Sequence, residues 1–288
     1  MVTVQKVHLR NCEEQGSEQL HFVNGTWETY TMEEKYIICE DSLEGILTAV
    51  YDAYALREGH EHIHIQVGEE DNYRLFATYM HSHPDAVKTD KVIRTLRSRL
   101  GEEVYVTICR AAASCDRSKG EAIYRTVVEG ITAGSGRRTM ENLRNPYVVR
   151  TFELARRTAN EVHHEVEFIR FQELQQGILY ALIGPENNVV PFVMPHFADR
   201  LATENFMIHD EKHGLYGIHP ARKEWYLVSE AEQLSKDRVQ WSQKEQQYQE
   251  LFTMFHKTIA IRERRNIRLQ CQMLPLRFQD YMVEFNKN

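Results

Sequence analysis

The spacing of apolar residues changes its period near position 167, and this change limits the folds that the chain can adopt. Before it, apolar side chains recur at helical intervals in the stretches 86–100, 102–112 and 119–132. After it, short apolar runs alternate with turn sequences such as Pro185–Asn188. Helical spacing followed by short runs between turns predicts helices first and then a sheet. We therefore expect an α+β fold with a mainly helical first half, a small antiparallel sheet and a helical C-terminal arm.

Two local patterns mark helix starts in the first half. Asp41-Ser-Leu-Glu44 follows a short apolar strand, Lys35–Glu40, and has the form of a capping box. Asn145 and Pro146 suit the cap and the first position of a helix. Between these helices, Gly134–Arg138 has the composition of a flexible loop.

Six short runs in the second half predict strands joined as an antiparallel meander. They are Phe168–Phe171, Gly177–Ile183, Val189–Met194, Phe206–Asp210, Leu215–His219 and Glu224–Val228. Ser229 and Glu232 then form a further capping box before a long polar helix. We expect that helix to bury an apolar stripe formed by Trp241, Tyr248, Leu251, Phe252 and Phe255.

These patterns divide the chain into four segments. They are an acidic N-terminal segment (1–34), a mainly helical region (35–166), an antiparallel β region (167–228) and a helical, basic C-terminal arm (229–288). From residue 35 onward we expect them to form one compact domain.

Charge is unevenly distributed along the chain, whose net charge is −7. Residues 1–70 hold four Lys and Arg against fourteen Asp and Glu, which argues against general coating of nucleic acid but leaves room for a local basic face. No apolar run approaches the roughly 20 residues that cross a bilayer, and the first twenty residues lack the pattern of a signal peptide. We expect a cytoplasmic protein without membrane contact.

The five cysteines are scattered, and no two of them form a CxxC pair. A disulfide framework, a zinc knuckle and a radical-SAM cluster of CxxxCxxC form are all disfavoured. We therefore expect no metal and no cofactor, and a colourless protein.

Histidines occur at several positions where a metal site could be considered. His60, His62 and His64 alternate with apolar residues, which predicts a strand with the imidazoles on one face. Without a nearby third-ligand motif, a solvated strand face is the simpler interpretation.

The densest polar cluster lies in the second half, and its members are His196, Asp199, Arg200, His209, Asp210 and His213. The first three share one helical turn, and His209 and Asp210 end a predicted strand. We expect the side chains to converge at one edge of the small sheet, with Asp199 supporting its neighbours. The cluster could be catalytic through His196, Asp199, His209 and Asp210, it could bind a phosphate or a base through Arg200, or it could be an ordinary surface ion pair.

The C-terminal arm carries the stronger binding signal. Between Phe255 and Phe278 its cations are Lys257, Arg262, Arg264, Arg265, Arg268 and Arg277, and its amides include Gln270 and Gln272. Cations suit phosphates, and amides suit phosphates or base edges. The alternatives are that the arginines pair with the acidic N-terminal region, or that the arm binds a protein.

Several stretches carry a family resemblance. They are Tyr36–Ile46, Asn145–Val148, Ile169–Leu174, Gly177–Ala181, Pro195–Arg200, Phe255–Arg264 and Leu269–Pro275. Together they resemble the SAM-linked conserved domain of the bacterial family called probable DNA-metabolism proteins, from about residue 35 to the end. In that family the domain is often fused to, or encoded near, a uracil-DNA glycosylase-type domain and a DNA-repair radical-SAM protein. We find no glycosylase-type Gly-x-Asp-Pro loop and expect no glycosylase activity.

The resemblance implies a role in DNA metabolism, with DNA and a radical-SAM DNA repair protein as partners. Our first hypothesis is a DNA-binding accessory protein of a radical-SAM-linked DNA repair or modification system. A catalytic subunit that acts on nucleic acid through the His/Asp/Arg cluster is the second hypothesis. A protein adaptor without nucleic-acid contact is the third.

Overall fold

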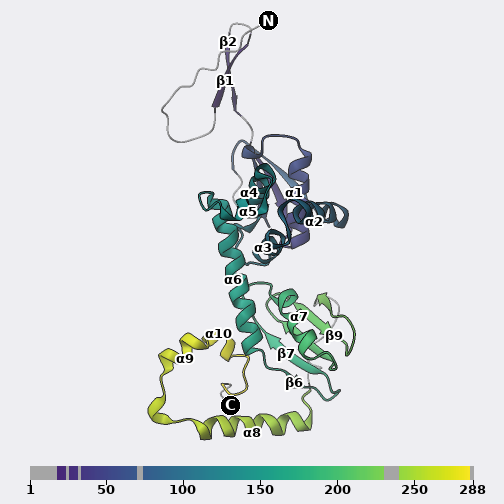
Figure 1. Ribbon diagram of the computed structural model, residues 1–288, viewed down its shortest axis with the longest axis vertical. Coiled ribbons are helices and arrows are strands. Elements are labelled where there is room, and N and C mark those ends of the chain that lie inside the picture. Colours follow the sequence, from purple (N-terminus) through teal and green to yellow (C-terminus); the bar gives the residue numbers. More distant parts are fainter. Residues whose placement is uncertain (1–17, 24–25, 32–33, 70–73, 230–239, 286–288) are drawn as a thin grey trace.

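The computed structural model describes residues 18–23, 26–31, 34–69, 74–229 and 240–285, with side chains from residue 34 onward except that of Arg262. It confirms an α+β fold with a predominance of helix. A first group of helices and strands lies at one end of the molecule, a second sheet lies towards the other end, and a long helix, α6, runs between them (Figure 1). Within the described residues, no helix is both long and apolar enough to cross a membrane.

A hairpin of β1 (Glu18–Val23) and β2 (Thr26–Thr31) precedes a small parallel sheet. The parallel sheet consists of β3 (Glu34–Cys39), β4 (Ile63–Val67) and β5 (Ala77–Ser82), in the order β4-β3-β5. The sequence predicts β3 but gives no sign of β5. The expected histidine strand is also shorter, because His60–His62 form a 3-10 turn and only His64 lies on β4.

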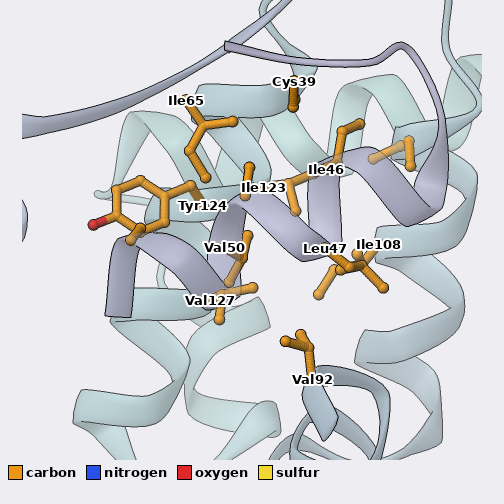
Figure 2. Packing of buried hydrophobic residues seen from close by; sticks show 14 of the residues in the cluster. Cys39, Ile46, Leu47, Val50, Ile65, Val92, Ile108, Ile123, Tyr124 and Val127 are labelled. Atoms are coloured by element: carbon orange, nitrogen blue, oxygen red, sulfur yellow. The ribbon is translucent and has the colours of Figure 1, made fainter. Parts of the chain in front are cut away.

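Helices cover one face of this sheet. They are α1 (Leu43–Ala55), α2 (Ala86–Leu100), α3 (Glu102–Ala112) and α4 (Lys119–Ala133). Ile37, Ile63 and Ile65 of the sheet belong to the same buried cluster as Leu47 and Ile123 of the helices. Figure 2 shows how α1 and α4 contribute side chains to this core. Burial of such aliphatic side chains is the main source of stability in a domain of this size.

The segment expected to be a flexible loop contains a short helix, α5 (Gly136–Glu141). Gly134 ends α4 in the left-handed conformation, with φ +66°. At Gly136 a Cβ would lie 1.8 Å from the carbonyl oxygen of Leu100, so the absence of a side chain lets α5 lie directly against the end of α2. Here glycine provides close packing rather than a loop.

Helix α6 (Pro146–Phe168) begins as the sequence predicts. The Asn145 side chain accepts a hydrogen bond from the backbone N–H of Tyr147, and Pro146 occupies the first turn. The helix continues through Phe168, and residues 169–171 form neither helix nor strand, so the strand expected at Phe168–Phe171 is absent. The two-residue strand β6 (Gln172–Glu173) follows it.

The second sheet contains five strands in the order β10-β9-β8-β7-β6. The other bounds are β7 (Leu179–Ile183), β8 (Phe206–Asp210), β9 (Leu215–His219) and β10 (Tyr226–Ser229). The prediction of a purely antiparallel sheet is wrong, because β7 and β8 are parallel. The run Val189–Met194, expected to be a strand, belongs mostly to helix α7 (Val190–Arg200), which makes this crossover.

The C-terminal arm contains α8 (Gln243–Ile259), α9 (Ile267–Met273) and α10 (Leu276–Gln279). Ser242, rather than Ser229, caps α8 by accepting a hydrogen bond from the N–H of Glu245, and Glu232 lies outside the described residues. The expectation of a buried stripe is wrong, because no residue of α8 is buried. Figure 1 shows α8 and α9 standing away from the rest of the molecule.

Candidate functional site

The structure places the two halves of the predicted His/Asp cluster in different environments. His196, Asp199 and Arg200 are exposed on α7. On β8, Phe206 and Ile208 pack with α7, so His209, the next residue along the strand, projects from the opposite face of the sheet. Asp210 follows on the α7 side of the strand, but its side chain is fully buried, whereas His196, Asp199 and Arg200 are exposed.

His209 and Asp210 have separate environments. His209 is buried, stacks on Tyr216 with ring centroids 4.1 Å apart, and lies 2.8 Å from the hydroxyl of Tyr180. Asp210 is fully buried, and its carboxylate accepts hydrogen bonds from the backbone N–H groups of Lys212 and His213 and pairs with the His213 ring at 2.6 Å. Neither arrangement leaves a reactive group at a surface, so the geometry favours structural roles for both.

The predicted nucleic-acid contacts of the arm, by contrast, are open to solvent. The exposed side chains include Lys257, Arg264, Arg265, Arg268, Gln270 and Gln272. None of the four cations forms an ion pair with any residue that the structure describes. The Arg262 side chain lies outside the described residues. The sequence thus predicted the composition of this surface, and the structure shows that it is accessible.

Both ends of the arm are fixed to the rest of the molecule. Before α8, the backbone N–H of Ser242 donates to the carbonyl of Glu173, and Glu245 accepts from the N–H of Glu173. After α9, Arg277 pairs with Glu161 and Glu186, at 3.4 and 2.9 Å. The exposed part is therefore a loop held at two points rather than a free tail.

A different site, which the sequence analysis discounted, lies on the parallel sheet. Tyr36 is the register partner of both His64 and Tyr79, so the three side chains form a row across β4, β3 and β5 on the face away from the helical core. The Tyr36 ring stacks on His64 with centroids 4.8 Å apart and on Tyr79 with centroids 5.2 Å apart.

This row lines a cavity of about 510 Å³. Its other walls come from the residues before and within α4 and from the start of α6, and they include Arg117, Ser118, Glu121 and Tyr147. Parallel sheets are usually covered on both faces, so a cavity on one face is a feature that requires explanation. Its volume falls within the range of small-molecule sites, roughly 300–1,000 Å³.

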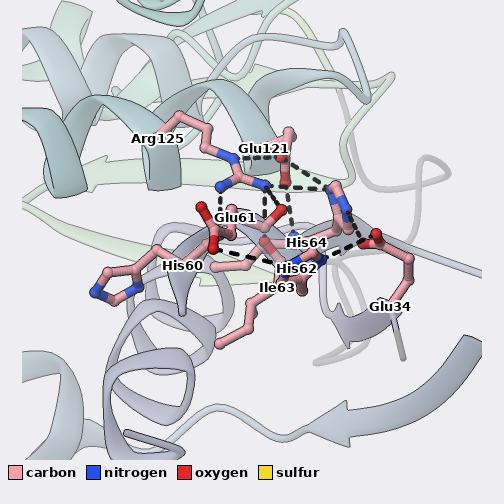
Figure 3. Close-up of polar contacts among 9 residues, drawn as sticks. Glu34, His60, Glu61, His62, Ile63, His64, Glu121 and Arg125 are labelled. Carbon is pink, nitrogen blue, oxygen red and sulfur yellow. Dashed lines mark hydrogen bonds and ion pairs between the residues drawn. The ribbon is translucent and has the colours of Figure 1, made fainter. Parts of the chain in front are cut away.

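An ionic network fixes one side of this cavity (Figure 3). The two ring nitrogens of His64 lie 2.9 Å from Glu34 and 3.1 Å from Glu121. Arg125 donates to Glu121 at 2.7 Å and to the backbone carbonyl of Ile63 at 3.0 Å. Glu121 also accepts a hydrogen bond from the backbone N–H of Ile65, which ties α4 to β4.

The network favours a charged imidazole. The hydrogen bond to Glu121 raises the pKa of His64, although burial opposes this. Burial by itself would raise the pKa of Glu121, but the contacts with His64 and Arg125 outweigh it and bring the pKa below its ordinary value. The pKa of Glu34 is also lowered, because its bonds to His62 and His64 outweigh burial. Only an imidazolium can donate from both ring nitrogens, so two carboxylates and two cations balance one another.

Two further arginines border the cavity. The guanidinium of Arg74 lies over the Tyr36 ring, 5.4 Å from its centroid, and Arg117 directly precedes α4. Both are exposed, and neither pairs with a carboxylate in the described part of the chain. Since the network beneath them is neutral, the cavity has an excess of positive charge. The His64 imidazolium already carries both protons, and carboxylates accept from both of its N–H groups, so it has no free position at which to take up a proton from a ligand. The arrangement therefore suits binding better than general-base catalysis.

The described residues include histidines, carboxylates and cysteines that bear on metal and thiol chemistry. No group of three His, Cys, Asp or Glu side chains is placed there to hold a metal ion. Burial raises the pKa of Cys39 to about 12 and also raises that of Cys109, which disfavours reactive thiolates.

A family model described as a domain of unknown function, DUF4130, matches residues 117–284, which is more than half of the chain. The chain belongs to this family. No curated protein matches it. The DUF4130 match includes helices α8, α9 and α10 of the arm and, at the cavity, Arg117, Glu121 and Tyr147, whereas Tyr36, His64 and Tyr79 precede it. The cavity is therefore formed jointly by DUF4130 residues and the preceding sheet.

Sequence reasoning missed this cavity for an identifiable reason. His64 was singled out, but its neighbours on the sheet, Tyr36 and Tyr79, depend on the pairing of three strands, one of which was not predicted. Recognising Ala77–Ser82 as a strand would have placed two tyrosines beside the histidine.

Proposed function

We propose that this protein is a bacterial, cytoplasmic DNA-binding accessory protein of a radical-SAM-linked DNA repair or modification system. The observation that carries DNA binding is the exposed arm, in which Lys257, Arg264, Arg265 and Arg268 extend into solvent without carboxylate partners among the described residues. Each phosphate that these cations neutralise would release counterions and add to affinity. The link to repair and to a radical-SAM partner comes from the family resemblance of the sequence.

The fixed ends of the arm support this role. A loop held at both ends loses less conformational freedom on binding than a free tail, so more of its contact energy contributes to affinity. Gln270 and Gln272 lie on the same exposed segment and can bind phosphates or base edges. The acidic character of the first 70 residues restricts favourable DNA contact to the basic surface.

The test compares two double variants that remove the same charge. Arg264→Gln/Arg265→Gln alters the arm, whereas Arg156→Gln/Arg157→Gln alters exposed arginines of α6. Binding of fluorescein-labelled single- and double-stranded DNA would be measured by anisotropy from about 50 to 200 mM salt. We expect the arm variant to weaken binding of every sequence and to flatten the salt slope by roughly one unit per lost contact. Equal slopes for the two variants would contradict the proposal.

A protein partner for the arm is the second candidate, and exposed apolar side chains favour it. Tyr248, Leu251 and Phe255 of α8 are 62%, 70% and 56% exposed. Such a patch on a folded protein commonly marks an interaction surface. Copurification with the radical-SAM protein, with and without DNA, separates the two functions. Loss of copurification in Leu251→Ser, with DNA affinity unchanged, would assign α8 to the protein partner.

A further inference from the structure

We propose that the cavity on the parallel sheet is a nucleotide site, in which an unstacked base lies against tyrosine rings and its phosphate pairs with Arg74 and Arg117. This inference rests on the proposed DNA-binding function and deepens it, because it supplies a place for one base outside a double helix. Neither the DUF4130 description nor the family resemblance assigns any role to this cavity.

The aromatic lining argues for a planar ligand. Tyr36, Tyr79 and Tyr147 all border the cavity, and the Tyr147 ring is held by Arg125, whose guanidinium lies 5.8 Å from its centroid. Proteins that bind single strands use such rings as stacking platforms. Tyr36 already stacks between His64 and Tyr79, so Tyr79 and Tyr147 are the rings that a base would meet.

The charges argue that the ligand is an anion. Glu34, Glu121, His64 and Arg125 neutralise one another within the network. Arg74, whose guanidinium lies over the Tyr36 ring, and Arg117 remain, and both are exposed at the cavity. Guanidinium groups bind phosphate through paired hydrogen bonds, so two arginines at one cavity suit a phosphate attached to a bound base.

The same residues provide hydrogen-bonding groups for a base edge. Gln66 lines the cavity, and its amide nitrogen donates to the carbonyl of Gly68 at 3.2 Å, which leaves the amide oxygen as an acceptor. Ser118 also lines the cavity, but its hydroxyl already donates to Asp116 and accepts from Arg150, so the Gln66 oxygen is the acceptor that suits a base edge. A cavity of about 510 Å³ has room for one nucleotide but not for a base-paired duplex.

The cavity and the arm lie at different places on the molecule. Tyr147 stands at the start of α6, and Phe168, at its end, contacts Phe278 beside the attachment of the arm. The 23 residues of α6 extend roughly 35 Å at 1.5 Å per residue. A mononucleotide can therefore occupy the cavity alone, whereas a strand of roughly ten nucleotides or more would be needed to reach both sites.

The experiment titrates the full-length protein with the four deoxynucleoside monophosphates by calorimetry. Inorganic phosphate and an unphosphorylated deoxynucleoside serve as partial ligands. We expect at least one monophosphate to bind more tightly than either partial ligand. Arg117→Gln should weaken this binding about tenfold, as should Tyr147→Leu, whereas the exposed control Arg157→Gln should not change it. Phosphate that binds as tightly as the best nucleotide would overturn the proposal, as would equal binding by Arg117→Gln and the wild type.

Further measurements show whether the ligand is a free nucleotide or a base in DNA. They also test the nucleotide site separately from the proposed DNA-binding function. An oligonucleotide with one unpaired base should compete with the monophosphate, and competition should fail in Arg117→Gln. If the free monophosphate binds but the oligonucleotide does not compete with it, the site stands and its ligand is a free nucleotide. If DNA binds through Arg264 and Arg265 but no monophosphate binds, the nucleotide site is refuted and the DNA-binding function stands. If monophosphates bind but DNA does not, the nucleotide site stands and the DNA-binding function is refuted.

Discussion

The imidazole of His64 lies 3.1 Å from the carboxylate of Glu121, and this contact joins strand β4 to helix α4 beside the cavity. Glu121 binds the backbone N–H of Ile65 as well, so one side chain holds both the ring and the strand. The position of α4 also depends on Gly120, where a Cβ would lie 2.9 Å from Val67. Close contact of α4 with β4 therefore determines where Arg117 and Ser118 border the cavity.

The first prediction concerns this pair and its pH dependence. Glu121→Gln should lower the free energy of unfolding by about 1.5–3 kcal/mol, the range for hydrogen bonds to charged groups. The raised pKa of His64 gives stability that is present below its ordinary value of 6.5 and is lost as the pH rises through the raised value. The lowered pKa of Glu121 gives stability that is present above 4.5 and is lost below it. The free energies of unfolding in urea should therefore differ most between these two values. The difference should shrink at alkaline pH, where only the pair with Arg125 remains, and should be least at acid pH, where Glu121 is protonated.

The second prediction concerns the two halves of the His/Asp cluster. His209→Ala should destabilise the protein by about 2–4 kcal/mol, because it removes a buried ring that stacks on Tyr216. Asp199→Ala, at an exposed position of α7, should change stability by less than about 0.5 kcal/mol. Thermal unfolding measures both. We also expect Asp199→Ala to complement a deletion strain fully. If this stable variant failed to complement the deletion strain, Asp199 at the end of α7 would have a functional role.

The third prediction concerns close backbone packing in the segment expected to be a loop. Gly136→Ala should destabilise by about 1–3 kcal/mol or more, because the new methyl group would meet the carbonyl of Leu100, which cannot move without moving α2. Gly184→Ala should cost less, since its nearest neighbour is the hydroxyl of Tyr281, the far end of a side chain that can rotate. Equal losses for the two variants in urea unfolding would argue against this account.

Helix boundaries in the first half were predictable because local chemistry determines them. The bounds of α2 and α3 agree with the expected ranges, and Asn145 caps α6 as its sequence indicates. Strands β8 and β9 were also predicted with their observed bounds, because turn residues separate their apolar runs. In each of these elements the backbone conformation follows from neighbouring residues.

The errors arose where tertiary packing decides the outcome. The apolar run Val189–Met194 suits a buried strand or a buried helix, and the positions of Val190, Val193 and Phe197 against the second sheet resolve it as α7. The stripe of α8 has helical spacing, but spacing cannot say what covers it. The cavity could not be predicted from the sequence for a related reason, because its lining depends on the pairing register of three parallel strands.

The last prediction concerns a buried carboxyl group of α6. Burial, followed by the charges of Glu161 and Asp210, raises the pKa of Glu165 to about 8, although Arg277 and Lys212 act in the opposite direction. A raised carboxyl pKa gives stability that is present below the ordinary value of 4.5 and is lost as the pH rises through about 8. In the wild type, the free energy of unfolding should therefore fall by up to a few kcal/mol over this range. Glu165→Gln, which cannot ionise at this position, should not show that fall. Glu167→Gln, at an exposed position of the same helix, is the matched control and should keep the wild-type pH profile. Urea unfolding from pH 5 to 9 would measure all three proteins, and parallel curves for Glu165→Gln and the wild type would show that Glu165 does not take up a proton on folding.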